Sequence, residues 1–182
     1  MIRKTILALS VMAVSVVATG AHVLAQEPVP PSLRVSGTFA DYVWVEAAVG
    51  NGAWHVTGEW VAQVKGNSGK GDFTASLLGV RSDLWVLQNF VDPANPALRS
   101  PHTHHVGLAD ADVTILPNGI RLEGVATITA NGSVAPYSGS TVRVDITGGN
   151  TIRYSNIKMT FTGQGVDHFG PQPYEGVVVL GR

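Results

Sequence analysis

The sequence predicts an all-β protein that folds as a single antiparallel barrel of about eight strands. Three observations support this prediction. From residue 33 onward, Val, Ile, Thr and aromatic residues alternate with polar ones, as in half-buried strands. Gly, Asn and Pro interrupt the alternation at short intervals, which indicates a meander joined by turns. A meander with one apolar face usually closes into a barrel, because closure removes exposed edges; a two-sheet β-sandwich is the alternative.

The first 25 residues differ in composition from the rest of the chain. Arg3 and Lys4 precede an apolar run over residues 6–18, and Val23-Leu24-Ala25 fits the small-residue rule for signal peptidase. The run is shorter than the ~20 apolar residues that a membrane anchor needs. We therefore expect residues 1–25 to be a cleaved signal peptide and the mature protein to be secreted or periplasmic.

The mature chain is predicted to hold one domain. Residues 26–32 carry three prolines and are expected to form an extended leader, which residues 33–182 follow as a single barrel domain. Removing the signal leaves 10 basic and 13 acidic residues without a basic block, so a nucleic-acid partner is not expected. No later stretch is apolar enough to cross a membrane as a helix. The chain has no cysteine, which excludes thiol catalysis.

Eight segments have the alternation and the length of β-strands. In chain order they are residues 33–49, 53–65, 72–90, 102–116, 120–130, 141–147, 151–162 and 174–180. The first places Phe39 on its apolar face and ends at Gly50-Asn51-Gly52, which suits the positive φ of hairpin turns. The second aligns Trp54 and Trp60 on one face. The third is the least regular, since residues 76–89 could also form a helix.

The later strands show clearer alternation. Pro117-Asn118-Gly119 separates the fourth strand from the fifth, in which Leu122 faces one side. In the sixth strand Val144 takes the apolar face, and Gly148-Gly149-Asn150 turns the chain into the seventh. The opposite faces of the fifth and sixth strands are charged, which disfavours an outer-membrane barrel because lipid demands apolar residues there. These charged positions are Arg121, Glu123, Arg143 and Asp145.

The connections between the predicted strands differ at the two ends of the barrel. In an up-and-down barrel, one end would carry the connections at residues 50–52, 92–101, 131–140 and 163–173. The other end would carry the tight turns at residues 66–71, 117–119 and 148–150. Three of the four connections at the first end are long. Long loops on a rigid barrel usually carry the function, so we expect the site at this end.

A cluster of histidines lies where the fourth strand leaves the long-loop end, in the sequence Pro-His-Thr-His-His at residues 101–105. His102 and His104 are two residues apart on a strand, so they point to one side with Cα atoms about 6.5 Å apart. Two imidazoles at this spacing can bind one metal ion. His104 shares its parity with Val106 and is expected to point inward, whereas His105 is expected to point outward.

A third ligand would come from another segment. His168, beside Asp167, lies in the loop before the last strand, at the same predicted end. His55 also begins a strand at this end, but its parity opposes the apolar face, so it should point outward. We therefore predict that His102, His104 and His168 bind a divalent transition metal such as zinc. The alternative is that these histidines only bind loop carbonyls or water.

The aromatic residues of the first strands form either a packed core or the wall of a ligand cavity. Barrels of about eight strands are just wide enough to hold one small ligand. Several glycines on the predicted inner faces would leave room for it, or would instead permit strand coiling; they are Gly37, Gly58, Gly79, Gly124 and Gly176. For a small apolar or aromatic ligand, the expected contacts are Trp54, Trp60, His104 and Tyr174.

The other motifs in the sequence do not indicate a functional site. Residues 64–71 do not form a Walker loop, because Val64 stands in place of the first Gly and Gly71 in place of the final Ser/Thr. No Gly-x-Ser-x-Gly elbow is present. Asp110 and Asp112 share a strand face, but such a pair more often marks a bulge or a solvated face than a glycosidase site. In architecture alone the chain resembles calycin-type small barrels, and architecture does not imply function.

Three functions remain open from the sequence. The first is a secreted or periplasmic binding module for a small apolar or aromatic ligand, with the histidine metal site at its rim. The second is a barrel-mouth enzyme, such as a hydrolase, lyase or cyclase, that uses a His/Asp cluster. The third is a structural or surface-interaction protein. The first is favoured, and a cavity continuous with His102 and His104 would separate the first two from the third.

Overall fold

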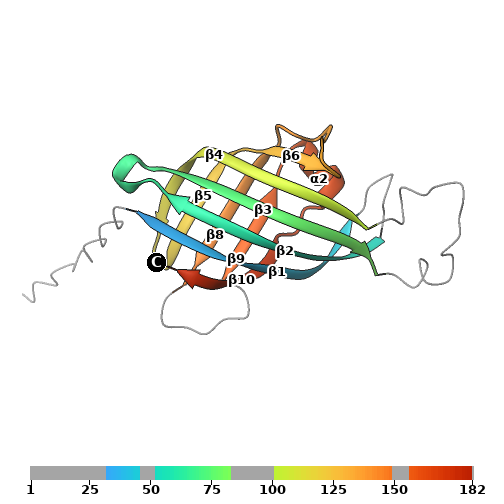
Figure 1. The fold of residues 1–182 in the computed structure, drawn as a ribbon, viewed down its shortest axis with the longest axis horizontal. Helices are drawn as coiled ribbons and strands as arrows, with labels where there is room; N and C mark the ends of the chain where they lie inside the picture. Colours follow the sequence, from blue (N-terminus) through green and yellow to red (C-terminus); the bar gives the residue numbers. More distant parts are fainter. Residues whose placement is uncertain (1–31, 46–51, 83–100, 149–155, 182) are drawn as a thin grey trace, which may run out of the picture.

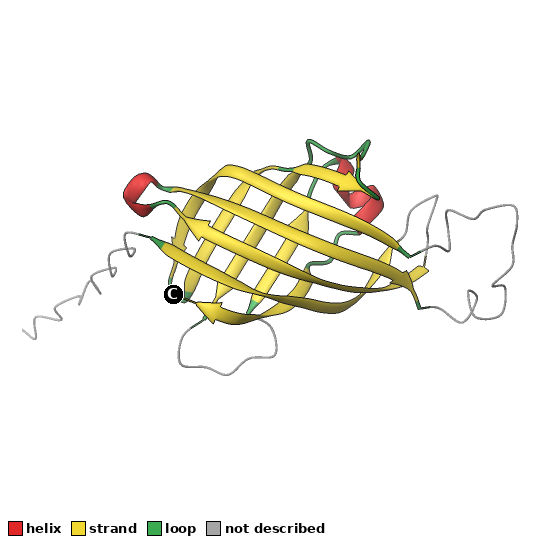
Figure 2. Ribbon diagram, in the orientation of Figure 1, coloured by secondary structure: helices red, strands yellow, loops and turns green. Residues whose placement is uncertain are grey.

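The computed structural model describes residues 32–45, 52–82, 101–148 and 156–181, which form a closed antiparallel barrel of eight strands (Figure 1). The barrel is therefore confirmed over the sandwich. Almost all of the described chain is strand, and the two short helices lie near opposite ends of the barrel (Figure 2). Within these described ranges, no helix is long and apolar enough to cross a membrane.

Ten strand segments make up the sheet. They are β1 (Leu33–Val45), β2 (Gly52–Val64), β3 (Lys70–Arg81), β4 (His102–Leu116), β5 (Gly119–Val125), β6 (Thr127–Ala130), β7 (Ser133–Val134), β8 (Thr141–Thr147), β9 (Ile157–Phe161) and β10 (Tyr174–Gly181). The helices are η1 (Gly66–Ser68) and α2 (Gln164–Phe169). Eight of these segments form the barrel, namely β1 to β5 and β8 to β10. Each of the eight pairs with the next one along the chain, and β10 pairs with β1 to close the ring.

The predicted fifth strand is divided in the structure. β5 and β6 pair with the two halves of β4, and the strand is interrupted between them at Ala126. β4 bulges at the facing position, where Asp110 has a positive φ of 52° and the register against β3 shifts. β6 then pairs with the two-residue β7, which lies inside the predicted 131–140 loop. Asp110 therefore lies at a bulge, one of the two non-catalytic interpretations given for the Asp110/Asp112 pair.

Residues 76–81 belong to β3, as expected for the third predicted strand; cross-strand pairing to both β2 and β4 excludes the helical alternative there. One expectation is corrected. The 163–173 loop contains α2, which is too short for a helical period to be visible in the sequence. The other predicted features lie outside the described residues: the signal peptide, residues 26–31 of the leader, and residues 46–49, 83–90, 92–100 and 151–155.

The interior is apolar and the exterior carries ion pairs. Trp60 is 1% exposed and lies 6.5 Å from Phe39 and 6.4 Å from Phe73, measured between ring centroids. On the outer face, Arg121 pairs with Asp145 at 2.6 Å, one of several such pairs between neighbouring strands. In the first, second, fifth and sixth predicted strands, the alternation therefore predicted correctly which side faces the core.

Some glycines allow neighbouring backbones to approach closely. A Cβ atom on Gly37 would overlap the carbonyl oxygen of Val177 and would lie 2.8 Å from the Trp60 ring. Gly58 and Gly176 would likewise meet the backbone of an adjacent strand. These positions support the strand-coiling interpretation of the inner-face glycines.

We expect Gly37→Ala to destabilise the barrel by about 1–3 kcal/mol, because the added methyl must displace either the β10 backbone or Trp60. The measurement is the free energy of unfolding in urea. Gly148→Ala is the matched control, since a Cβ there has no atom within 4 Å. Equal unfolding free energies for the two variants would contradict the steric explanation.

Candidate metal centre

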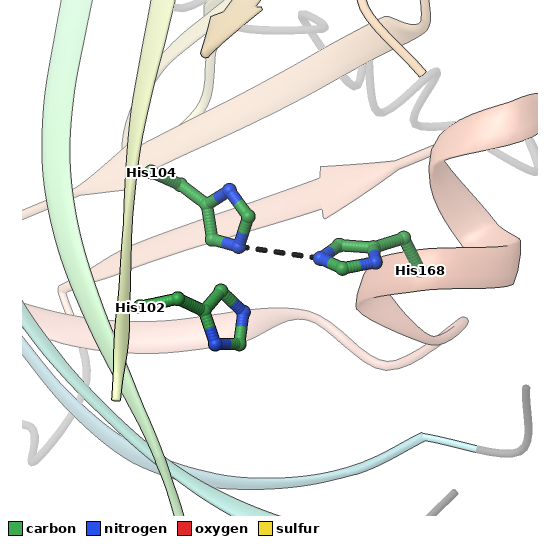
Figure 3. Close-up of side chains that lie close together, drawn as sticks. All are labelled: His102, His104 and His168. Atoms are coloured by element: carbon green, nitrogen blue, oxygen red, sulfur yellow. Dashed lines mark hydrogen bonds between the residues drawn. The ribbon is translucent and has the colours of Figure 1, made fainter. Parts of the chain in front are cut away.

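Three histidines meet at the long-loop end of the barrel. His102 and His104 project from the start of β4 toward His168 on α2 (Figure 3). Each offers one ring nitrogen, and these three nitrogens all lie within 4.8 Å of one another. The Nε2 atoms of His104 and His168 are 3.2 Å apart. Two nitrogens bound to one tetrahedral zinc ion lie about 3.3 Å apart, given Zn–N bonds of about 2.0–2.1 Å. The structure therefore brings together the predicted ligand set.

Strand parity and neighbouring residues set the direction of the β4 histidines. His104 is 4% exposed and takes the inward direction that its parity predicted. His102 lies opposite Gly79 of β3, and its ring packs edge-on against Trp54 at 4.9 Å. Gly79 lies against both rings: a Cβ there would be in ordinary van der Waals contact with each of them, at 3.6 Å.

The short helix α2 is anchored by an aromatic residue next to His168. Phe169 is buried and stacks on Phe161 of β9 with ring centroids 3.8 Å apart. Its carbonyl accepts a hydrogen bond from the Tyr174 hydroxyl at 3.0 Å. The helix ends at Phe169, and the N–H of the following Gly170 donates to the carbonyl of Val166 at 2.9 Å. His168 is thus held over the barrel mouth by its neighbour in the core.

Tyr137 is a site residue that sequence reasoning missed. Its hydroxyl lies 3.3 Å from Nδ1 of His104, and its ring stacks on His168 with centroids 4.2 Å apart. One side chain therefore contacts two of the three histidines. The signal available in the sequence was its place in residues 131–140, a long connection at the same predicted end.

The geometry around His104 leaves one nitrogen for a metal. Its Nδ1 faces the Tyr137 hydroxyl and its Nε2 faces His168. When Nδ1 carries the proton, it donates to the hydroxyl oxygen and Nε2 keeps a free lone pair. Outer hydrogen bonds of this kind fix the tautomer of metal-binding histidines.

We expect Tyr137→Phe to weaken zinc binding about tenfold, at the lower end of the range for lost outer-shell hydrogen bonds. The substitution keeps the stacked ring and removes only the hydroxyl. A competitive titration against a chromophoric chelator measures the effect. Tyr42→Phe is the control, since Tyr42 is an exposed tyrosine that stacks on the outward-facing His55. Equal affinities in the two variants would show that the hydroxyl does not support His104.

A small cavity adjoins the histidines. Its volume is about 40 Å³, which is larger than the roughly 10–15 Å³ that one water molecule needs. Its walls are Val45, Trp54, Val56, Leu77, Gly79, His102, His104, His168, Phe169 and Tyr174. Of the expected ligand contacts, Trp54, His104 and Tyr174 line this cavity. Trp60 does not line it and packs in the core between Phe39 and Phe73.

The remaining candidate residues lie away from the cluster. His105 points outward, and its Nδ1 is 2.9 Å from the Ser76 hydroxyl. His55 also points outward, as predicted. Asp167 is exposed on α2 and does not join the metal-binding group. Asp110 and Asp112 contact Lys65 and Lys70 near η1, at the opposite end of the barrel.

The enclosed side chains are uncharged at neutral pH. Burial, followed by the neighbouring His102 and His168, lowers the pKa of His104 to about 3. Burial and then His102 lower the pKa of His168 to about 4. Burial raises the pKa of Tyr137 to about 12, so it remains a phenol. His104 and His168 are therefore in the neutral form that binds metal ions.

Comparisons with known proteins give no family for this chain. No family model, curated protein or solved structure matches it. Small barrels host many unrelated functions, so a function must be assigned from the site itself. The histidine cluster and the adjoining cavity are the features that support an assignment.

Proposed function

We propose that this protein is a small β-barrel binding module of the secreted or periplasmic compartment. It holds a divalent transition metal at His102, His104 and His168, with a small apolar or aromatic ligand in the adjoining cavity. The observation that carries the proposal is the convergence of three buried or half-buried imidazoles from β4 and α2, all of which line one cavity.

The donor set favours zinc. Three imidazole nitrogens are a donor set of open, four-coordinate zinc sites, and the 3.2 Å between the Nε2 atoms of His104 and His168 fits two ligands of such an ion. Cu(II) and Ni(II) prefer square-planar or tetragonal sites. Three protein ligands leave a fourth position for another group, as in open zinc sites. Tyr137 supplies the outer hydrogen bond that such ligands usually have.

The cavity wall supports a ligand with an apolar part. Trp54, Val56 and Leu77 form one side of it, and all three are buried. None of the described residues that line the cavity is an Asp or Glu, so the His/Asp pairing that the enzyme alternative requires is not found in this lining. This favours binding over the alternative of a His/Asp enzyme.

The test is a zinc titration of the full mature chain after treatment with a chelator. We expect one zinc per chain, measured by native mass spectrometry and elemental analysis after dialysis. Zinc at 100 times its dissociation constant should also stabilise the fold by about 2.7 kcal/mol, because the unfolded chain lacks the assembled site. Substoichiometric zinc without any stabilisation would refute the metal site.

A further inference from the structure

The charge around the cluster points to the kind of ligand that a metal here would accept. This inference rests on the proposed metal site. Metal-bound histidines are neutral, so a divalent ion on His102, His104 and His168 keeps both positive charges. None of the described residues lining the cavity is acidic. The Asp41 carboxylate acts electrostatically on Tyr174, which lines the cavity. It accepts hydrogen bonds from the backbone N–H groups of Tyr42 and Glu175.

An uncompensated dication among apolar walls is unfavourable. Burial of a charge costs free energy unless an opposite charge or a polar group compensates it. The histidines supply nitrogen donors and no negative charge. The open coordination position is therefore the place where an anionic donor gains most. The wall formed by Trp54, Val56 and Leu77 offers that donor's neighbouring atoms apolar contact and no charged partner.

The size of the cavity limits what is enclosed. About 40 Å³ is well below the roughly 150 Å³ cavity that encloses a benzene molecule. Only the donor group and the atoms next to it fit inside, and the rest of a larger ligand would extend into the mouth. A narrow or flat group next to the anion is therefore favoured over a branched one.

We infer that the ligand of this site is an apolar monoanion. Its single anionic donor, such as a carboxylate, completes the coordination of the metal. The atoms of its unbranched or aromatic body that lie next to the donor contact Trp54, Val56 and Leu77. Both parts are required: the anion compensates the metal, and the body gains free energy from apolar burial.

Cobalt(II) is the probe for the experiment, because its visible absorption reports ligands that enter the coordination sphere. The Co(II)-loaded protein is titrated with butyrate, benzoate, formate and butyramide. We expect butyrate and benzoate to change the spectrum with affinities about tenfold or more above that of formate, since their bodies bury additional carbon atoms. Butyramide has the shape of butyrate without its charge, and we expect it to leave the spectrum unchanged.

A variant of the cavity wall distinguishes the contribution of the apolar body to the affinity from that of the anionic donor. Leu77→Ala should weaken butyrate binding about tenfold while the affinity for formate stays unchanged, because only butyrate contacts that wall. Formate binding as tightly as butyrate, or butyramide acting like butyrate, overturns the inference alone. Failure of Co(II) to bind overturns the proposed function together with this inference.

Discussion

Replacing His104 with Ala is expected to abolish zinc binding, lowering the affinity by more than about a hundredfold. His104 lies between the other two ligands, with its Nε2 3.2 Å from that of His168 and its ring centroid 4.7 Å from that of His102. Loss of a residue that only hydrogen-bonds to a metal ligand already lowers the metal affinity about 10–100-fold. Loss of this ligand removes a metal bond and leaves the other two histidines without their shared neighbour.

Isothermal titration of the metal-free proteins measures this effect. His105→Ala is the control, because His105 is the next residue of the same strand and points outward. His168→Ala should lose zinc as well, and its half-buried position on α2 reduces the risk of a core cavity. Wild-type affinity in His104→Ala, in a protein with an unchanged circular dichroism spectrum, would rule out this metal site.

The metal-free protein is expected to lose stability steeply as the pH falls from about 6.5 to about 4. A histidine in the unfolded chain has a pKa of about 6.5, whereas those of His104 and His168 are lowered to about 3 and about 4. In this window the unfolded chain binds protons that the folded chain does not. Each histidine therefore removes up to about 1.4 kcal/mol of unfolding free energy per pH unit, and the effect vanishes above about pH 7.

Urea unfolding between pH 7.5 and pH 4.5 measures this dependence in the metal-free proteins. The double variant His104→Gln/His168→Gln should lose the steep part of the pH profile. His105→Gln changes an exposed histidine of the same strand and should keep the wild-type profile. If the double variant loses stability as steeply as the wild type, the acid sensitivity arises from other groups.

Period-two alternation was enough to predict much of this site. It determines which side of a strand faces the core, and so it separated His104 from His105 and placed His55 outside. Counting connections then placed His102, His104 and His168 at one end. This step worked because every barrel strand pairs with its neighbour in sequence, so the direction of the chain alternates without crossovers.

Strand parity does not tell how far along the barrel axis a side chain lies, and it gives no information about the connections between strands. Trp54 and Trp60 share a face, but six residues of strand separate them by about 20 Å, so only Trp54 reaches the cavity. Tyr137 and α2 lie in connections without a periodic pattern. Their positions depend on tertiary contacts, such as the stacking of Phe169 on Phe161, which no local signal in the sequence encodes.

The seam between β1 and β10 also has a consequence for biogenesis. These two strands come from opposite ends of the domain, and their pairing completes the ring. A nascent chain that still lacks its last strand therefore cannot finish folding, whatever its other strands do. Such contacts between distant segments make folding slow, on the order of milliseconds to seconds. During synthesis the polypeptide therefore stays open until its last strand is available.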